Sequence, residues 1–340
     1  MSENKILHVM ILDKFLASYI EFIDKNFGRE NHHYVFITSE KYEYGLTPEH
    51  KVEFLHTDDD IFITLLKYMK MAKKIILHGL WRDKVDILLY FNKKLLKKCY
   101  WVMWGGDFYF PETKSKIRHK IIKNMGCYIS ATKYDIDYIK DKYKTKSDNI
   151  FFSQYYPSCI SDFSKNYTKE LNRSIKILIG NSATKTNRHK EIFEILKQYK
   201  DQNIEIIVPL NYGVQNYKDE VIKFGNNIFG YKFKPVTNFL NFEEYKDLLN
   251  KVDIAIFNNN RQQAGANIKL LIGYGKKVYV SKENSFYKEL KFNNIKIFDI
   301  ENFNLEKINP KIAKKNKKFA LKYYSLKSLI NSWKNIFNSK

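Results

Sequence analysis

Cysteines and long apolar runs are scarce in this chain of 340 residues, which contains only Cys99, Cys127 and Cys159. The three lie far apart, without a pairing framework or the short spacing of metal ligands, which is typical of proteins of the reducing cytosol. No apolar run approaches the roughly 20 residues that span a bilayer, and residues 1–5 lack the basic start of a signal peptide. We therefore expect neither a disulfide-stapled domain nor an integral membrane protein.

Acidic residues are also in short supply, since 37 Asp and Glu stand against 59 Lys and Arg and leave a net charge of +22. Such a charge attracts polyanions, either nucleic acid or an anionic membrane surface. The sequence has no helix-turn-helix, zinc-finger or RNA-recognition signature, so we expect the membrane surface and no specific nucleic acid. Residues 311–340 hold nine lysines, no acid and helically spaced aromatics. They predict a basic amphipathic helix whose apolar face packs on a domain; the alternative is that its aromatic face and lysines lie on a membrane.

Familiar catalytic and metal motifs are missing. The chain contains no phosphate-binding loop ending in Gly-Lys-Ser/Thr, no Gly-x-Ser-x-Gly elbow and no His, Cys and Asp set with metal-ligand spacing. Thr57-Asp58-Asp59-Asp60 resembles the acidic metal motif of some sugar transferases. It precedes a predicted helix, where Thr and Asp are favoured caps, and we interpret it as a cap. We therefore expect no metal and no other cofactor.

Short apolar runs alternate with stretches of helical periodicity, which indicates an α/β fold with parallel sheets and crossover helices. Helices are expected near 60–73, 190–199 and 243–250. The segment from Tyr155 to Arg173, with Pro157 and several Ser and Asn residues, is the best linker candidate. We predict two Rossmann-like domains facing each other across a cleft, at 1–157 and 170–310, followed by the helix of 311–340. The predicted strands are residues 5–11, 34–37, 51–55, 74–78, 99–104, 126–130, 149–152, 174–180, 204–209, 252–257 and 276–281.

Two polar loops in the second half follow predicted strands. The first begins at Gly180, which allows close backbone approach, and Lys185 and Arg188 in it could neutralise phosphate. The second runs from Arg261 to Gly265 and opens a helix, whose first N–H groups attract an anion. An ordinary strand-to-helix turn explains either loop alone. Together they predict a diphosphate held at the carboxyl ends of the strands.

In the first half, Trp104-Gly105-Gly106-Asp107-Phe108-Tyr109 ends a predicted strand. The glycines leave backbone open to a ligand, Trp104 and Tyr109 offer a wall for a sugar, and Asp107 can accept a proton. His78 and Asp13 also follow strands, so all three polar groups could converge at one edge of the sheet. The alternative is structural: Asp107 caps a turn and His78 is a buried polar residue.

Several fragments, taken together and in the same order, resemble the enterobacterial-common-antigen transferases of glycosyltransferase family 56. Those enzymes move 4-acetamido-4,6-dideoxygalactose from dTDP to a lipid-linked disaccharide. The loops 181–185 and 264–267 depart from the family pattern, as does the lysine-rich C-terminus, so fold and reaction class transfer better than sugar and acceptor. The fragments are Leu77-His78-Gly79, 104–109, 177–182 with Asn187 and His189, 208–212, Arg261-Gln262-Gln263 and 283–287.

The resemblance implies a GT-B fold, a metal-independent reaction, and peripheral attachment to the cytoplasmic face of the inner membrane. A dTDP- or UDP-sugar is the expected donor and an undecaprenyl-linked saccharide the expected acceptor. Asp107 is the expected base, with His78 and Asp13 behind it, and Trp104, Gly105, Gly106 and Tyr109 are on the acceptor side. The expected donor-binding residues are Gly180, Asn181, Ser182, Lys185, Asn187, His189, Arg261, Gln262, Gln263 and Gly265.

Two other functions stay open on the sequence. A nucleotide-sugar epimerase or hydrolase can use the same two-domain scaffold, and it would consume the donor without any lipid acceptor. A non-enzymatic basic protein that binds nucleic acid would show a steeply salt-dependent affinity for duplex and no response to dTDP or UDP.

Overall fold

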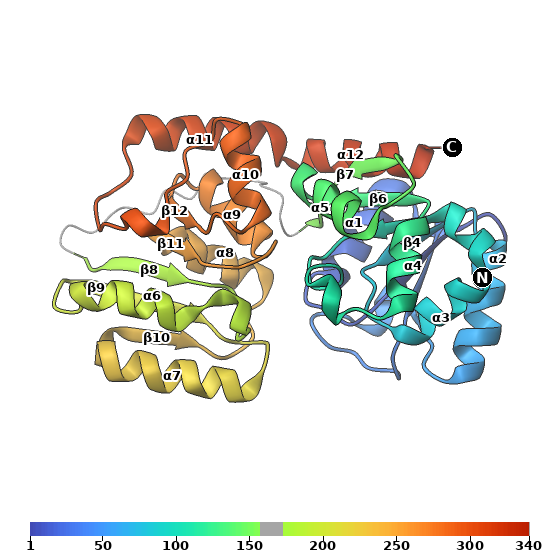
Figure 1. Cartoon of the computed structure of the whole chain (residues 1–340), viewed down its shortest axis with the longest axis horizontal. Coiled ribbons are helices and arrows are strands. Elements are labelled where there is room, and N and C mark those ends of the chain that lie inside the picture. The colour runs from blue at the N-terminus through green and yellow to red at the C-terminus, as the bar shows by residue number, and fades with distance from the viewer. Residues whose placement is uncertain (157–172, 340) are drawn as a thin grey trace. The chain divides into compact units, whose positions relative to one another are not determined.

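The computed structural model describes residues 1–156 and 173–339, and the chain divides into two compact units (Figure 1). Unit 1 comprises residues 1–157 together with 329–340, and unit 2 comprises residues 158–328. Most of the predicted linker 155–173 lies outside the described residues, as does Cys159. Cys99 and Cys127 are buried free thiols.

Unit 1 is built on a seven-stranded parallel sheet with the order β3-β2-β1-β4-β5-β6-β7. The strands are nearly continuous apolar runs because both faces of a parallel sheet are covered. They are β1 Ile6–Met10, β2 His32–Phe36, β3 Glu53–Phe54, β4 Lys74–His78, β5 Cys99–Val102, β6 Cys127–Ser130 and β7 Ile150–Phe152.

The helices of unit 1 cover both faces of this sheet. They are α1 Leu16–Phe27, α2 Leu66–Met71, α3 Asp83–Phe91, α4 Lys116–Asn124 and α5 Lys133–Tyr143. Crossover connections are right-handed, so connections running in opposite directions along the sheet place their helices on opposite faces. The α2–α5 face carries an apolar core with Leu7, Val9 and Leu77. The α1 face carries His8, His32 and His78, all at most 1% exposed.

Unit 2 has a five-stranded parallel sheet with the order β10-β9-β8-β11-β12 (Figure 1). Its strands are β8 Ile175–Ile179, β9 Ile204–Pro209, β10 Phe233–Val236, β11 Ile254–Phe257 and β12 Lys277–Val280. Its helices are α6 His189–Leu196, α7 Gln215–Phe229, α8 Phe242–Lys251, α9 Gly265–Gly273, α10 Ser285–Phe292 and α11 Pro310–Tyr323.

Most predicted strands form within two residues of the expected ends, and the π-helical turn Asp60–Leu65 continues into α2 as expected for the helix near 60–73. The Asp60 carboxylate accepts hydrogen bonds from the backbone N–H groups of His56 and Thr57, which supports the interpretation of 57–60 as a cap. The sequence prediction missed α7 and the edge strand β10. In β10, Lys234 and Pro235 interrupt the apolar run, and proline is tolerated only at an edge of a sheet.

The single helix predicted over 311–340 is wrong, because the segment forms two helices, α11 and α12 Leu326–Asn338. Tyr324 ends α11, and the Ser325 hydroxyl accepts from the N–H of Ser328, so a new helix begins there. The predicted packing of the apolar face is found: Trp333 of α12 is fully buried and lies beside Tyr19 of α1. Ala320 of α11 is buried in unit 2.

In the described ranges 1–156 and 173–339, no helix is both long and apolar enough to cross a membrane.

Candidate functional site

Each sheet has a point where the direction of the connections reverses, between β1 and β4 in unit 1 and between β8 and β11 in unit 2. Ligands of open α/β sheets bind beyond the carboxyl ends of the strands at such a point. Four of the loops predicted to carry chemistry follow these strands, and the loop of Asp107 follows β5, the strand next to β4. Asp13 follows β1, Gly79 follows β4, Gly180 follows β8 and Gln263 follows β11.

The two predicted donor loops of unit 2 are joined by Gln263. Its Nε2 donates to Asn181 Oδ1 at 3.0 Å and to Ser182 Oγ at 3.3 Å, and its Oε1 accepts from the Thr186 hydroxyl at 2.7 Å. The structure therefore brings the loop after β8 and the loop after β11, both predicted to hold the donor diphosphate, into direct contact.

Asn187 organises the inside of the same loop. Its Nδ2 donates to the Ser182 carbonyl and to Thr184 Oγ1, and its Oδ1 accepts from the Asn181 N–H and from Asn259 Nδ2. Only 1% of Asn187 is exposed. This corrects its prediction as a donor-binding side chain, because its polar atoms are already used to shape the loop.

The N-terminus of α9 faces this loop region without a side-chain cap. Ala264, the residue before α9, is in the left-handed conformation (φ +59°), and its side chain offers no hydrogen bond to the first amides. A Cβ at Gly265 would lie 2.4 Å from the Phe286 ring, so only glycine allows this close packing. Uncapped helix amides carry partial positive charge and favour an anion.

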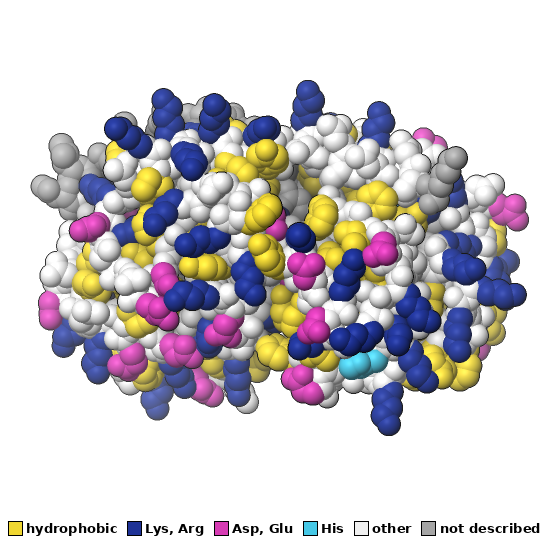
Figure 2. Space-filling view, turned by 45° about the horizontal axis from the view of Figure 1, so that its top comes forward, with side chains coloured by type: hydrophobic (Ala, Val, Ile, Leu, Met, Phe, Trp, Pro, Cys, Tyr) yellow, Lys and Arg dark blue, Asp and Glu magenta, His cyan; other side chains and the backbone are white. Residues whose placement is uncertain are grey.

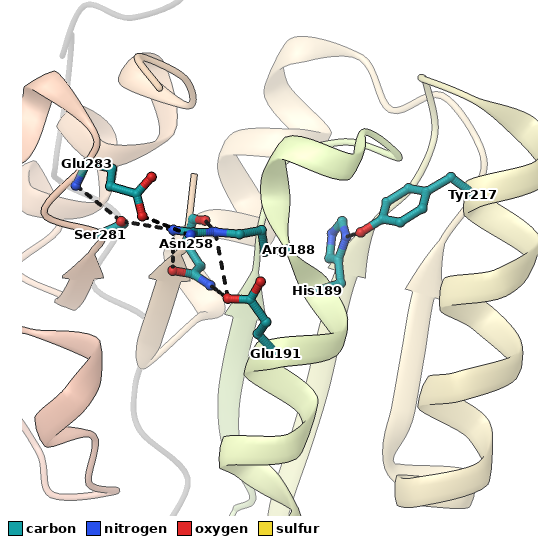
Figure 3. Close-up of polar contacts among 7 residues, drawn as sticks. All are labelled: Arg188, His189, Glu191, Tyr217, Asn258, Ser281 and Glu283. Atoms are coloured by element: carbon teal, nitrogen blue, oxygen red, sulfur yellow. Dashed lines mark hydrogen bonds and ion pairs between the residues drawn. The ribbon is translucent and has the colours of Figure 1, made fainter. Parts of the chain in front are cut away.

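Arg188 connects three strand ends instead of facing a ligand (Figure 3). Its Nε donates to the Asn258 carbonyl at 2.8 Å, and its Nη2 lies 3.2 Å from Ser281 Oγ. Its Nη1 lies 2.8 Å from Glu283 Oε1. Because Glu283 pairs with its charge, the expectation that Arg188 neutralises phosphate is not supported. The residue instead fixes the ends of β11 and β12 to the β8 loop.

His189 lies inside unit 2, not on a binding surface. Its Nδ1 is 3.2 Å from the Tyr217 hydroxyl, its side chain is 0% exposed, and burial lowers its pKa to about 4 (Figure 3). A Cβ on Gly180 would come within 2.8 Å of His189 Nε2. The predicted contact of His189 with the donor is therefore corrected. The imidazole supports the Gly180 turn, whose φ of +66° also requires glycine.

The remaining predicted donor residues lie at or near the loop surface. Lys185 is exposed and makes no hydrogen bond or ion pair with the described residues. Arg261 is partly buried and donates to the Gln262 carbonyl, and Gln262 is also partly buried. Lys185, Arg261 and the α9 amides are the positive groups predicted to face the donor that lie at this edge.

Asp107 of unit 1 is a structural anchor, which corrects its prediction as the catalytic base. It is 0% exposed, and its carboxylate accepts from the N–H groups of Leu80 and Trp104 and from Trp101 Nε1, at 2.8 to 3.1 Å. Burial raises its pKa, and the three hydrogen bonds oppose that shift. With both oxygens occupied, Asp107 fixes the turn after β5 and has no access to a substrate.

His78 and Tyr109 are also internal. Burial lowers the pKa of His78 to about 3, and both ring nitrogens are hydrogen-bonded, to His8 and to Tyr155. The Tyr109 hydroxyl donates to Asp135 at 2.7 Å inside the core. Neither the predicted catalytic contact of His78 nor the predicted acceptor contact of Tyr109 fits these positions, because both side chains point into the unit.

Asp13, unlike Asp107, has a carboxylate oxygen without a hydrogen-bond partner. This atom, Oδ1, is buried, and burial raises the pKa of Asp13. Trp81, in the loop after β4, has an indole Nε1 that is also buried and unpartnered. One acceptor and one donor atom are thus left unsatisfied beside the switch point of unit 1. Buried polar atoms are almost always paired in proteins, so this pair suggests a place for a ligand or water.

Aromatic rings line the same edge. The Phe15 ring lies 4.8 Å from that of Trp104 and 4.5 Å from that of Tyr155, and Trp81 meets Trp104 at 5.7 Å. Added Cβ atoms on Gly79 and Gly106 would approach the Trp81 indole to 2.0 and 2.7 Å. The glycines therefore make room for this indole. The turn at Gly105 (φ +84°) places Trp104 at the sheet edge.

Phe15, Trp81 and Tyr155 were not predicted as site residues. Phe15 and Trp81 lie in the loops that follow β1 and β4, and the same kind of position had pointed to Asp13. No such signal marked Tyr155, which falls in the segment interpreted as a linker.

Lysine side chains are spread over the surface and do not gather in one patch on the face drawn in Figure 2. Several of the basic residues between 93 and 123 have internal roles. Lys98 donates to the carbonyls of Lys70 and Ala72, Lys114 donates to that of Gly106, and Arg118 is buried against Asp86. Among the described residues, no group of His, Cys, Asp and Glu has the arrangement of a metal site.

Solved sugar-nucleotide enzymes share this fold over the whole chain. A glycosyltransferase from Rickettsia africae ESF-5 matches with a TM-score of 0.71 and 14% identity over 100% of both chains. Anabaena HepE in complex with UDP matches with a TM-score of 0.70 and 12% identity, over 99% of this chain and 100% of that one. The UDP-GlcNAc 2-epimerase from Neisseria meningitidis bound to UDP-GlcNAc has a TM-score of 0.55 at 12% identity, over 98% of both chains.

At these identities the similarity shows the fold alone, an α/β GT-B fold, and confirms the predicted fold class. A sequence family distinguishes transferases from epimerases where the fold does not. The family described as 4-alpha-L-fucosyltransferase, glycosyl transferase group 56, matches residues 8–338. This confirms the resemblance at the level of the family and, with it, the enzyme class. The chain belongs to glycosyltransferase family 56.

Proposed function

We propose that this glycosyltransferase moves a deoxyamino sugar from a nucleotide diphosphate, most simply dTDP, to an undecaprenyl-linked saccharide in bacterial surface polysaccharide synthesis. The family description names transfer of a 6-deoxyhexose, fucose, and solved proteins of the same fold are bound to UDP or UDP-GlcNAc. The observation that carries the proposal is the pair of joined loops beside the uncapped N-terminus of α9.

The donor diphosphate would lie against Gly180, Asn181, Ser182, Gln263 and the first amides of α9. Lys185 and Arg261 add positive charge at this edge. Helix amides and cations that face a departing diphosphate stabilise the negative charge that develops on it, as a metal ion does in other enzymes. We therefore propose a metal-independent reaction.

On the acceptor side, Asp13 replaces Asp107 as the proposed base. An inverting transfer needs a group that takes the acceptor hydroxyl proton while that oxygen bonds to the anomeric carbon and the bond to the diphosphate oxygen breaks. Asp13 has the free Oδ1 atom and the raised pKa that suit a base. The rings of Phe15, Trp81 and Trp104 would contact the apolar face of the sugar, and Trp81 Nε1 would donate to one of its oxygens.

Calorimetric titration with dTDP, UDP and GDP tests the donor site before any acceptor is known. We expect one of them to bind, and we expect Gln263→Ala to weaken that binding at least tenfold, because the link between the two loops is lost. Unchanged affinity in that variant would refute the donor site. Analysis of products from dTDP- and UDP-sugars, with and without an undecaprenyl-diphosphate disaccharide, separates a transferase from an epimerase or hydrolase.

Substitution of Asp13 should lower activity and spare stability, whereas substitution of Asp107 should lower stability. Asp13→Asn should lower kcat by roughly 100-fold or more, the usual contribution of a general base, and leave nucleotide affinity and thermal stability near those of the wild type. Asp107→Asn should instead lower the free energy of unfolding by about 2 kcal/mol, since its amide cannot accept all three hydrogen bonds. Full transfer activity in Asp13→Asn would exclude that residue as the base.

We also propose peripheral attachment to the cytoplasmic face of the inner membrane. Support comes from the exposed lysines of residues 311–334, among them Lys311, Lys314, Lys315 and Lys318, next to the exposed Leu321 and Tyr323. Each lysine near an anionic surface contributes about 1 kcal/mol. Co-sedimentation with vesicles containing anionic lipid should exceed that with neutral vesicles and weaken with salt, and equal co-sedimentation would contradict the proposal.

A further inference from the structure

Three histidines on the α1 face of unit 1 form a continuous buried chain. His8 of β1 lies between the other two: its Nδ1 is 3.1 Å from Nε2 of His78, and its Nε2 is 2.9 Å from Nδ1 of His32. At the far end, His78 Nδ1 is 2.7 Å from the Tyr155 hydroxyl. That hydroxyl accepts from Trp104 Nε1 at 2.9 Å. The chain thus runs from the start of β2 to the aromatic edge beside Asp13.

The chain has a direction. A neutral imidazole has one donor and one acceptor nitrogen, and both nitrogens of His8 and of His78 are used within the chain. All donors must therefore point the same way. In one arrangement Tyr155 donates to His78, and each imidazole donates from Nε2 to the next. In the reverse arrangement His78 donates to Tyr155, and the tyrosine proton turns out of the chain.

The environment keeps the three imidazoles neutral. Burial lowers the pKa of His32 and of His78 to about 3, and burial together with the two neighbouring histidines holds the pKa of His8 well below its ordinary value. A protonated imidazole has two donors and would break the direction of the chain. The other ionisable groups near it are Lys5, Arg29, Tyr19 and Tyr34, and the charge of His33 acts on it from the opposite face of β2.

The direction matters at the acceptor edge. The Phe15 ring, two residues after Asp13, packs on the rings of both Tyr155 and Trp104. Burial raises the pKa of Tyr155, and the Asp13 charge adds to that shift. In the first arrangement the Tyr155 hydroxyl donates to His78, and it therefore does not donate to the Asp13 carboxylate. In the reverse arrangement the tyrosine proton is released toward the edge where Asp13 lies, and a hydrogen bond to it would make Asp13 a weaker base.

We propose that His32, His8, His78 and Tyr155 are positioning residues of the acceptor site. They keep the Tyr155 hydroxyl donating to His78 and hold Trp104 in place, so that Asp13 is left to accept the substrate proton. This rests on the proposed role of Asp13. None of the three histidines touches substrate, and the effect passes through Tyr155.

The test uses the end of the chain farthest from the site. His32→Leu removes the acceptor of the His8 proton, and His32→Asn restores an acceptor oxygen near the position of Nδ1. We expect His32→Leu to raise KM for an undecaprenyl-diphosphate disaccharide about five- to tenfold, a typical effect of one orphaned buried donor. It should also shift the acidic limb of the kcat/KM pH profile to lower pH and leave nucleotide affinity unchanged. His32→Asn should restore the wild-type profile. His33→Leu, in the same strand on the other face, is the matched control.

A second measurement needs no variant and no acceptor. Nitrogen-15 spectra of histidine-labelled protein at pH 7 should show His8, His32 and His78 as neutral rings protonated on Nε2. A ring protonated on Nδ1, or an imidazolium, would overturn the assigned direction. If His32→Leu keeps the wild-type acceptor KM and pH profile while Asp13→Asn loses transfer, the positioning role of the histidines is refuted and the role of Asp13 is not. Unchanged acceptor kinetics in both variants would refute the acceptor site itself.

Discussion

At the scale of single residues, burial and the number of hydrogen bonds decide which polar group holds the fold and which can act. Asp107 and Asp13 both follow strands of one sheet, yet only Asp13 keeps a free oxygen. Asn187 of unit 2 resembles Asp107, because its side-chain amide is hydrogen-bonded to four groups of two loops and is buried. Sequence position placed these residues in loops after strands but did not reveal their roles, because partners distant in the chain determine them.

Replacing Asn187 with alanine tests this distinction. We expect the free energy of unfolding of unit 2 to fall by about 2–4 kcal/mol, because the buried donors of Asn181 and Asn259 lose their acceptor. Nucleotide affinity should fall as well, since the Gly180 turn is no longer held. Urea unfolding followed by circular dichroism, with calorimetry for dTDP and UDP, measures both effects. A variant of wild-type stability with weakened binding would instead make Asn187 a direct ligand contact.

At the scale of elements, the strands and most helices could be predicted because apolar runs and helical periodicity are local properties of the sequence. The edge strand β10 escaped because Lys234 and Pro235 obscure its pattern. The division of 310–338 into α11 and α12 escaped for another reason. Both helices continue one apolar spacing, and only the Ser325 cap and their packing in different units separate them.

Lys74 shows how α12 is held in unit 1. It is 3% exposed at the start of β4, and its Nζ donates to the Ile336 carbonyl at 2.8 Å, to Ser339 and to the Tyr100 hydroxyl. A cation at the carboxyl end of a helix satisfies its last carbonyls and complements its dipole. Lysines at several other places also donate to backbone carbonyls, as Lys277 does to Asn304 and Glu306.

We expect Lys74→Met to loosen α12 without unfolding the rest of unit 1. Backbone amides of residues 329–338 should exchange with solvent faster, and the free energy of unfolding should fall by about 1–3 kcal/mol, since buried carbonyls lose their donor. Lys73→Met, at the exposed neighbouring position, should change neither measurement. Hydrogen exchange read by mass spectrometry compares the two, and equal protection of α12 in both would show that Lys74 does not hold the helix.

At the scale of the whole molecule, the net charge of +22 says less about partners than the sequence alone suggests, because some of the lysines and arginines serve inside the units. The distribution of aromatic residues is more informative. All four tryptophans, Trp81, Trp101, Trp104 and Trp333, belong to unit 1. Tryptophan fluorescence therefore reports the unfolding of unit 1 alone, which contains the histidine chain and the carboxylates with raised pKa.

The stability of unit 1 should decrease as the pH falls below about 6.5. An unfolded histidine binds its proton near that pH, whereas folded His32 and His78 bind theirs only near pH 3, and burial also holds the pKa of His8 well below its ordinary value. Between pH 6.5 and pH 3 the unfolded state therefore holds more protons than the folded state, so acid favours unfolding. Each histidine then removes about 1.4 kcal/mol by pH 5.5. Asp86, whose pKa burial raises to about 6, and Asp13 and Asp107 act in the opposite direction, because their folded forms take up protons first.

A comparison of two proteins isolates the histidine contribution from these carboxylates. Urea unfolding followed by tryptophan fluorescence at pH 7.5 and 5.5 gives the loss of free energy for the wild type and for His32→Asn, which cannot be protonated at that position. The variant should lose about 1.4 kcal/mol less than the wild type over this interval, since the remaining ionisable groups are shared. An equal loss in both proteins would mean that His32 takes up its proton in the folded state too, and a chain of neutral imidazoles could not then persist at mildly acidic pH.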